Sequence, residues 1–273
     1  MSVLNIKSLV SGGVIVNYHC VSRCGHCLYN CGPHRDRAYL GTGPAEAIFG
    51  RIAQLGCRSV HIGGGEPLLN PDGLVAVLHA AVRAGMGIDY VETNSAWYVD
   101  RARAVEILAD LRAAGLRTLL ISMSPFHNAS IPFARVRGVI EACRETGIEV
   151  FPWVNAFVRD LDRLGDRETH GQDTTHFHID LEGRYIPGLC TGLAFAMEDL
   201  GGPLPAGRYP LLERLADAGI KGLFDLARKT YGFAPTRESF LNHCDLCTDI
   251  RHYLVQREGV VFPELAPRGF YGL

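Results

Sequence analysis

Four cysteines follow one another closely near the start of the chain, and their spacing limits the chemistry they can support. Cys20, Cys24 and Cys27 lie within the stretch CVSRCGHC, and Cys31 follows shortly afterwards. Such a group can form a disulfide knot, a closed tetrahedral zinc site or an iron–sulfur cluster. A cluster held by only three thiolates leaves one iron open to a further ligand, and this is the arrangement suited to catalysis.

Composition helps to choose among a disulfide knot, a zinc site and an iron–sulfur cluster. The chain has 273 residues, of which 47% are hydrophobic, so it can form one large globular domain with or without an appendage. The N-terminus lacks the features of a secretory signal, and no run of about 18 apolar residues indicates a membrane span. We therefore expect a cytoplasmic protein, in which the nine cysteines are not paired as disulfides and the clustered ones serve as metal ligands or catalytic groups.

The charge balance argues against polyanionic partners. Lys and Arg number 27 and Asp and Glu number 29, which gives a formal net charge of −2. Basic runs interleaved with aromatic residues are not found. We expect no nucleic-acid partner and no association with a membrane.

Short β-branched or apolar runs alternate with amphipathic stretches from Gly13 to about Asn155, which indicates repeated strand–helix units around a parallel sheet. The predicted strands are 13–19, 59–63, 89–93, 118–123 and 150–155. The predicted helices are 44–56, 71–85, 101–115 and 132–147. Right-handed connections between such units give an α/β barrel or part of one.

The polar motifs of the chain all fall directly after predicted strands. They are the cysteine loop, GGGEP, ETNS and SMSPFH. A parallel strand–helix barrel builds its active site at the ends of its strands, so these motifs should lie together.

These motifs resemble those of the radical S-adenosylmethionine (SAM) superfamily. Cys20-x3-Cys24-x2-Cys27 is similar to the superfamily's cysteine motif, with the aromatic His26 directly before the last cysteine. GGGEPLL at 63–69 looks like its glycine-rich segment, and VETNSAW at 91–97 is similar to its third-strand motif.

The resemblance implies a partial (β/α)6 TIM barrel in residues 1–155. It also implies a [4Fe–4S] cluster on Cys20, Cys24 and Cys27 that binds SAM through its amine and carboxylate. Reductive cleavage of SAM would then give a 5′-deoxyadenosyl radical that abstracts a hydrogen atom from the substrate. A flavodoxin- or ferredoxin-type electron donor is expected.

The remaining SAM-binding predictions concern side chains and backbone at strand ends. The glycines of GGGEP let the backbone approach a ligand, and the Glu66 carboxylate or neighbouring carbonyls can meet the methionine ammonium. A plain strand-to-helix turn is the alternative for this segment, and the strand-end Thr, Asn and Ser residues can equally be helix caps. The predicted cofactor-binding residues are His26, Gly63, Gly64, Gly65, Glu66, Pro67, Thr93, Asn94, Ser122, Ser124 and Asn155.

Two further residues are candidates for direct participation in the reaction. His127, in SPFHN, is placed to contact substrate or SAM, with an ordinary loop histidine as the alternative. Cys31 can be an auxiliary ligand, a hydrogen-atom donor or an idle loop thiol.

The strand–helix alternation is lost in residues 156–273, which we expect to complete the barrel and add an appendage. A predicted hairpin over 176–188 is followed by Cys190, and NHCDLC places Cys244 and Cys247 in a CxxC pair. This pattern resembles the twitch or SPASM extension of some radical SAM proteins, which carries auxiliary [4Fe–4S] clusters. The chain has fewer cysteines than a full SPASM pattern, so one auxiliary cluster is the most it can hold. Zinc or a free CxxC is the alternative.

The predicted function is that of a radical SAM enzyme acting on a small molecule or a peptide, with oxidation, epimerisation or crosslinking as the outcome. A ribosomal-peptide-modifying maturase is the alternative within this class. A zinc-binding interaction protein and an electron-transfer protein are the alternatives outside it. Cys57 and Cys143 are expected to be buried structural residues on helices.

Overall fold

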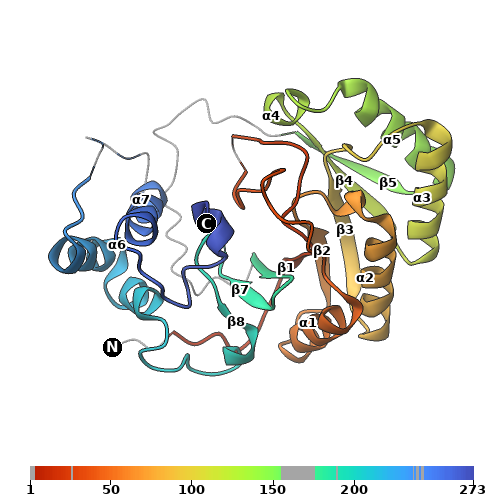
Figure 1. The fold of residues 1–273 in the computed structure, drawn as a ribbon. Helices are drawn as coiled ribbons and strands as arrows, with labels where there is room; N and C mark the ends of the chain where they lie inside the picture. Colours follow the sequence, from red (N-terminus) through yellow and green to blue (C-terminus); the bar gives the residue numbers. More distant parts are fainter. Residues whose placement is uncertain are drawn as a thin grey trace. The chain divides into compact units, whose positions relative to one another are not determined.

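The computed structural model describes residues 4–25, 27–154, 176–188, 190–235, 237, 240 and 243–273. These residues form two compact units (Figure 1). The sheet unit comprises 9–154 together with 178–183, and the C-terminal unit comprises 4–8, 176–177 and the described residues from 184 onward. The predicted boundary near residue 156 stays a prediction, because it lies outside the described residues.

The sheet unit is built on a parallel sheet. Its strands are β1 (Gly12–Ile15), β2 (Ser59–Gly63), β3 (Gly87–Thr93), β4 (Thr118–Met123), β5 (Glu149–Val154) and β6 (Phe177–Asp180). Their order is β5-β4-β3-β2-β1-β6, and β1 to β5 run parallel. The described strands form an open sheet, so the predicted partial barrel is confirmed.

Four helices alternate with these strands and cover one face of the sheet (Figure 1). They are α1 (Thr42–Gln54), α2 (Pro71–Arg83), α3 (Arg101–Ala113) and α5 (Phe133–Thr146). Val60 and Ile62 of β2 are fully buried, and His61 between them points to the opposite, inner face because side chains alternate along a strand. The apolar outer face of the sheet therefore forms the core of this unit with the helices.

The first strand is shorter than the sequence predicts. Regular pairing ends at Ile15, although Val16 N still donates to the carbonyl of Gly63 at the end of β2. The Asn17 and His19 carbonyls accept from Gly65 and Glu66, which follow β2. Gly64, with a φ of +155°, breaks the regular strand geometry at that point. A short helix, α4 (Pro125–Asn128), was not predicted, and it begins at the Ser124 cap.

The C-terminal unit contains β7 (Arg184–Ile186) and β8 (Phe195–Ala196), which pair antiparallel, and helices α6 (Pro210–Tyr231) and α7 (His243–Gln256). Its core includes a run of neighbouring aromatic rings, Phe177, Tyr185, Phe195 and Tyr209. The strands β6 and β7 flank the predicted turn at Glu182-Gly183, where Gly183 has a φ of +72°.

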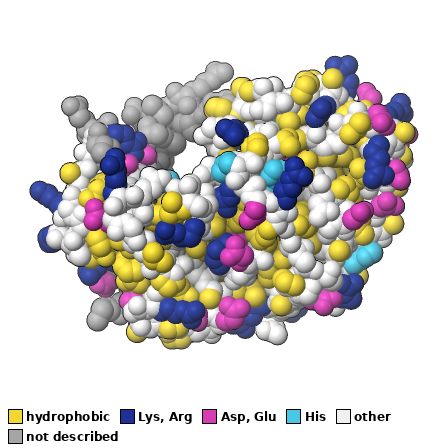
Figure 2. Space-filling model, viewed as in Figure 1, with side chains coloured by type: hydrophobic (Ala, Val, Ile, Leu, Met, Phe, Trp, Pro, Cys, Tyr) yellow, Lys and Arg dark blue, Asp and Glu magenta, His cyan; other side chains and the backbone are white. Residues whose placement is uncertain are grey.

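The face of the molecule seen in Figure 2 carries charges of both signs. Basic and acidic side chains are intermixed over the face seen in Figure 2, as the near balance of charges implies. No helix in the described part of the chain combines the length and the apolar character needed to cross a membrane.

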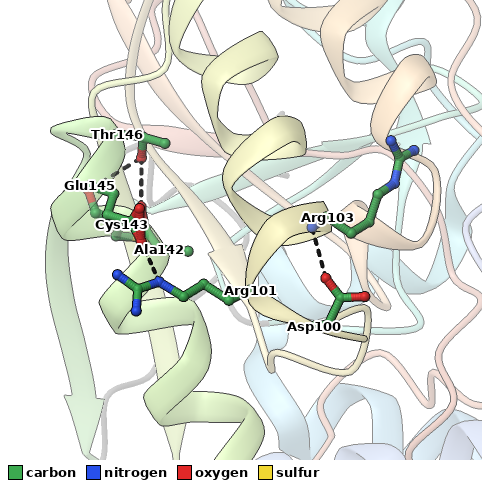
Figure 3. Close-up of polar contacts among 7 residues, drawn as sticks. All are labelled: Asp100, Arg101, Arg103, Ala142, Cys143, Glu145 and Thr146. Atoms are coloured by element: carbon green, nitrogen blue, oxygen red, sulfur yellow. Dashed lines mark hydrogen bonds and ion pairs between the residues drawn. The ribbon is translucent and has the colours of Figure 1, made fainter.

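The start of α3 makes two polar contacts, a cap within the helix and an ion pair to the neighbouring α5 (Figure 3). The Asp100 carboxylate accepts a hydrogen bond from the Arg103 backbone N–H at 2.9 Å, which caps the start of α3. Arg101 forms an exposed ion pair with Glu145 of α5. A cap satisfies a backbone donor that the helix leaves unpaired, whereas an exposed ion pair is weakened by solvent.

We therefore expect Asp100→Ala to lower the free energy of unfolding by about 1 kcal/mol. Asp100→Asn should keep most of the stability of the wild type, because an asparagine oxygen can accept the same hydrogen bond. Urea unfolding of the two variants beside the wild type measures the difference. An equal loss in both variants would show that the charge of Asp100, and not its capping bond, matters.

Candidate functional site

A buried carboxylate joins the two loops that follow β2 and β3. Glu66 has no exposed surface, and its carboxylate accepts hydrogen bonds from Leu68 N at 3.2 Å, Thr93 Oγ1 at 2.8 Å and Asn94 N at 2.7 Å. Burial raises the pKa of Glu66 to about 7, although the bonds from Asn94 and Thr93 oppose this shift. The GGGEP and ETNS motifs are thus one connected structure.

This geometry shows what Glu66 and Thr93 contact within the protein, and their predicted roles in SAM binding stay predictions. The Glu66 carboxylate is buried and accepts three hydrogen bonds within the protein, which favours the neighbouring backbone carbonyls as partners of a methionine ammonium. The Thr93 hydroxyl also accepts hydrogen bonds from Ser95 N and Trp97 Nε1, each at 3.0 Å. Both side chains therefore hold neighbouring segments together, and the motif alone does not reveal these contacts.

Asn17 connects the start of the cysteine loop to the glycine-rich segment, and sequence reasoning missed it. Its side-chain oxygen accepts from Gly65 N at 3.2 Å, and its amide donates to the Glu66 carbonyl at 3.1 Å. Gly65 N also donates to the Asn17 carbonyl at 2.8 Å. A polar side chain directly after an apolar strand, as in GVIVN, was the available signal.

The glycines of GGGEP are required by contact between backbone segments. A Cβ atom on Gly65 would lie 2.1 Å from the His19 carbonyl oxygen, and one on Gly64 would lie 2.5 Å from Asn17 Oδ1. On Gly63, a Cβ would lie 2.8 Å from Glu92 Oε2. Gly64 and Gly65 therefore make room for residues 17–19. Their predicted approach to a ligand stays a prediction.

Among the described residues, N–H groups donate hydrogen bonds to two of the three clustered thiols. Cys20 Sγ accepts from Ser22 N at 3.4 Å and from the Asn94 amide at 3.3 Å. Cys27 Sγ accepts from Cys31 N at 3.4 Å. Cys24 is partly exposed, and its thiol lies 3.7 Å from the Phe126 carbonyl oxygen of α4. Asn94 thus contacts the cysteine loop directly, as a neighbour of a thiol.

The surroundings of these thiols shift their pKa values in opposite directions. Burial raises the pKa of Cys20 to about 11. The Cys31 thiol donates to Cys27 and, together with backbone amides of Tyr29, Asn30 and Cys31, lowers the pKa of Cys27 to about 6. Cys31 is buried beside Cys27, so it is a hydrogen-bonding neighbour of a predicted ligand and not an isolated loop thiol.

The donor set fits an iron–sulfur cluster. All nine cysteines lie in the described part of the chain, and none of them is in a disulfide. Within the described residues, no three Cys, His, Asp or Glu side chains gather closely enough to hold a single metal ion. The ligands of a [4Fe–4S] cluster each bind a different iron, and hydrogen bonds to sulfur are what tune such clusters.

Other predicted residues divide into three groups. Ser124 and His127 bond to each other, with Ser124 Oγ 2.7 Å from His127 Nδ1, and Ser124 caps α4 as its alternative reading proposed. Ser122 is a half-buried residue of β4, and Pro67 begins a short 3-10 helix. His26 and Asn155 lie outside the described residues.

Comparison with known families decides between the interpretations of this loop. The sequence model of the radical SAM superfamily matches residues 14–159, more than half of the chain. The chain belongs to the radical SAM superfamily. Members of this superfamily are enzymes that use SAM together with a [4Fe–4S] cluster. No curated protein matches the sequence.

Several solved radical SAM structures resemble the chain. A structure of anSMEcpe with bound AdoMet is 18% identical over 52% of this chain and 43% of that chain, with a TM-score of 0.40. Another anSMEcpe structure with bound AdoMet is 12% identical over 91% and 97%, with a TM-score of 0.47. BtrN in complex with AdoMet and 2-DOIA is 14% identical over 68% and 74%, with a TM-score of 0.45. This chain thus spans less than half the length of the first of these structures.

The three later thiols of this radical SAM protein lie in the C-terminal unit. Cys244 and Cys247 stand one turn apart on α7, and the buried Arg251 follows one turn later. The Arg251 guanidinium donates to the Thr191 carbonyl at 2.8 Å and hydrogen-bonds to the Cys247 side chain. Since Thr191 directly follows Cys190, Arg251 contacts both cysteine segments.

The structural cysteines are placed largely as expected. Cys143 is fully buried on α5. Cys57 is also buried, but it lies in the turn between α1 and β2 rather than on a helix, because α1 ends at Gln54.

The close approach of Gly65 to His19 predicts a strong effect of a single methyl group. Gly65→Ala should displace residues 17–19, and we expect it to lower both the free energy of unfolding and the iron retained after anaerobic reconstitution. Gly50→Ala on α1 is the matched control, because a Cβ there meets nothing within 4 Å. It should be neutral or stabilising by up to about 1 kcal/mol. Normal stability and iron content in Gly65→Ala would contradict the packing argument.

The raised pKa of Glu66 predicts a pH dependence with a defined sign. Between its ordinary pKa of 4.5 and about 7, the folded protein holds a proton that the unfolded chain has released. Wild-type stability should therefore fall as pH rises through this window, by up to about 1.4 kcal/mol per pH unit from this group. Glu66→Gln lacks the titrating carboxyl and so lacks this pH dependence. Glu92 titrates in the same range but is present in both proteins, so it does not contribute to the difference between them.

Urea unfolding of the cluster-free chain at several values between pH 5 and pH 8 gives the comparison. The gap between the wild type and Glu66→Gln should change steadily in favour of the variant as pH rises. Parallel stability curves would show that Glu66 is ionised in the folded protein throughout.

Proposed function

We propose that this radical SAM protein cleaves SAM reductively and abstracts a hydrogen atom from a substrate. The observation that carries the proposal is the cysteine loop. Its sulfurs at Cys20 and Cys27 accept hydrogen bonds from amide N–H groups, and the GGGEP and ETNS motifs are tied to it through Glu66, Asn17 and Asn94.

Cys20, Cys24 and Cys27 would hold the [4Fe–4S] cluster. When bound, the cluster and SAM supply one-electron cleavage of the sulfonium to methionine and a 5′-deoxyadenosyl radical, which removes the substrate hydrogen. The Asn94 amide and the Ser22 N–H orient Cys20, and Cys31 orients Cys27. These donors stabilise negative charge on sulfur and thereby influence the potential of a cluster bound there.

The methionine end of SAM would meet the backbone of GGGEP, because Glu66 and Thr93 are occupied within the protein. Ser122, His127, His26 and Asn155 remain candidates for contacts with SAM or substrate. Water must be kept from the reactive species, and the protein's part is to orient and shield it.

The C-terminal unit would hold one auxiliary [4Fe–4S] cluster through Cys190, Cys244 and Cys247, in the manner of a twitch-like extension. Arg251 supports this proposal, because a buried guanidinium supplies the positive charge that clustered thiolates require. Burial opposes that charge, yet Tyr271 and Cys247 outweigh it and raise the pKa of Arg251. The fourth iron of this auxiliary cluster would be bound by a group other than these three cysteines.

The substrate is a small molecule or a peptide, and the outcome is an oxidation, epimerisation or crosslink. We propose a flavodoxin- or ferredoxin-type electron donor and a cytoplasmic location, as the sequence predicts. Neither nucleic acid nor a membrane surface is proposed as a partner.

Replacing Cys20, Cys24 and Cys27 together with Ala should abolish formation of 5′-deoxyadenosine from SAM with dithionite, because the ligands of the SAM-binding cluster are gone. Chromatography of anaerobic reactions measures the product. The matched control is the Cys190/Cys244/Cys247→Ala variant, which should still form it. Product from the first variant at the wild-type rate would overturn the ligand assignment.

Iron and sulfide analysis of the same two variants tests the auxiliary cluster. Each variant should keep about four irons per chain and the wild type about eight, on the stoichiometry of cysteine-held clusters. If the folded Cys20/Cys24/Cys27→Ala variant holds no iron, the C-terminal unit carries no cluster.

A further inference from the structure

A second group of ionisable side chains lies on the inner face of the sheet, and the motifs of the sequence did not indicate it. His61 of β2 and His178 of β6 face each other with their Nε2 atoms 3.1 Å apart. Glu92 of β3 lies beside them, with Oε1 4.0 Å from His61 Nε2. The His61 ring stacks on Tyr90 with ring centres 5.0 Å apart.

Neighbouring strands leave space for this group. A Cβ on Gly13 of β1 would lie 2.2 Å from His61 Nε2, and a Cβ on Gly63 of β2 would lie 2.8 Å from Glu92 Oε2. Both glycines therefore accommodate side chains from the strand beside them. His61 and His178 are buried, whereas 40% of the Glu92 side chain remains accessible. Of these three side chains, Glu92 is the one that a ligand can reach from solvent.

Tyr29 places this group next to the cysteine loop. Its ring meets His178 edge-on with ring centres 5.5 Å apart. Its hydroxyl is buried and has no hydrogen-bond partner within the described residues. His178 joins Tyr29 to His61 and, through His61, to Glu92, and Tyr29 lies two residues after Cys27 in the cysteine loop.

We propose that Glu92 and Tyr29 bind a protonated amino group of the substrate, with His61 and His178 holding the site in place. The proposal rests on the proposed function, because the amine-bearing compound would be the substrate of the radical reaction. An ammonium group has three donors and no acceptor, and it can give hydrogen bonds to the Glu92 carboxylate and to the Tyr29 oxygen.

Charge favours a cation over the alternatives. Strands β1 to β6 contain no Lys or Arg, and within the described residues Glu92 has no Lys or Arg partner. His61, 4.0 Å away, is the nearest group that could carry a positive charge, and burial raises the pKa of the Glu92 carboxyl to about 7. A bound ammonium would compensate the charge of Glu92, whereas a carboxylate or phosphate would add repulsion.

The test is binding of ethylammonium chloride to the full chain carrying its clusters, followed without oxygen by saturation-transfer NMR of the ligand. We expect saturable binding to the wild type and at least tenfold weaker binding to Glu92→Gln. Tyr29→Phe, which keeps the ring against His178, should weaken binding severalfold. Glu46→Gln, which removes an exposed carboxylate of α1, is the matched control and should bind as the wild type does.

Ethanol and acetate, at equal ionic strength, complete the comparison. No saturable binding of ethylammonium, equal binding by Glu92→Gln, or preferred binding of acetate would each overturn the proposal. Iron content and unfolding of each variant show that it is intact, and Tyr29→Phe keeps the test open if Glu92→Gln fails to fold. Formation of 5′-deoxyadenosine by the wild type without any amine tests the proposed function separately.

Discussion

The buried carboxylate of Glu66 is the interaction on which the arrangement of the site depends. It accepts donors from the loop after β2 and from the loop after β3, so neither loop can move without leaving a buried charge or a buried donor unsatisfied. Asn94, fixed by this contact, reaches Cys20, and Asn17 fixes the other side of the glycine-rich segment. The position of Cys20 therefore depends on this polar network as well as on the cysteine loop.

Local pattern was enough to predict much of the fold. The bounds of β2 and β4 agree with the sequence prediction, because alternating apolar runs and flanking glycines are local signals. The family resemblance was correct for the same reason, since its motifs are contiguous. The roles of Glu66 and Thr93 were not predictable, because they depend on hydrogen bonds between segments that are 27 and 28 residues apart.

Distance along the chain also explains what was missed. His61 and His178 are 117 residues apart, and nothing in either strand identifies the other as a partner. The same holds for Arg251, which contacts the residue after Cys190 only because α7 packs there. In both cases a side chain with an ordinary local context acquires its significance from tertiary contacts between distant segments.

The central claim is that Cys20, Cys24 and Cys27 leave one iron of a cluster open for SAM. Electron–nuclear double resonance on the reduced Cys190/Cys244/Cys247→Ala variant, which would keep this cluster alone, tests it most directly. With SAM labelled by ¹⁵N at the methionine amine and ¹⁷O at its carboxylate, the account predicts hyperfine couplings from both labels. A cluster signal that shows neither coupling in the presence of saturating SAM would contradict it.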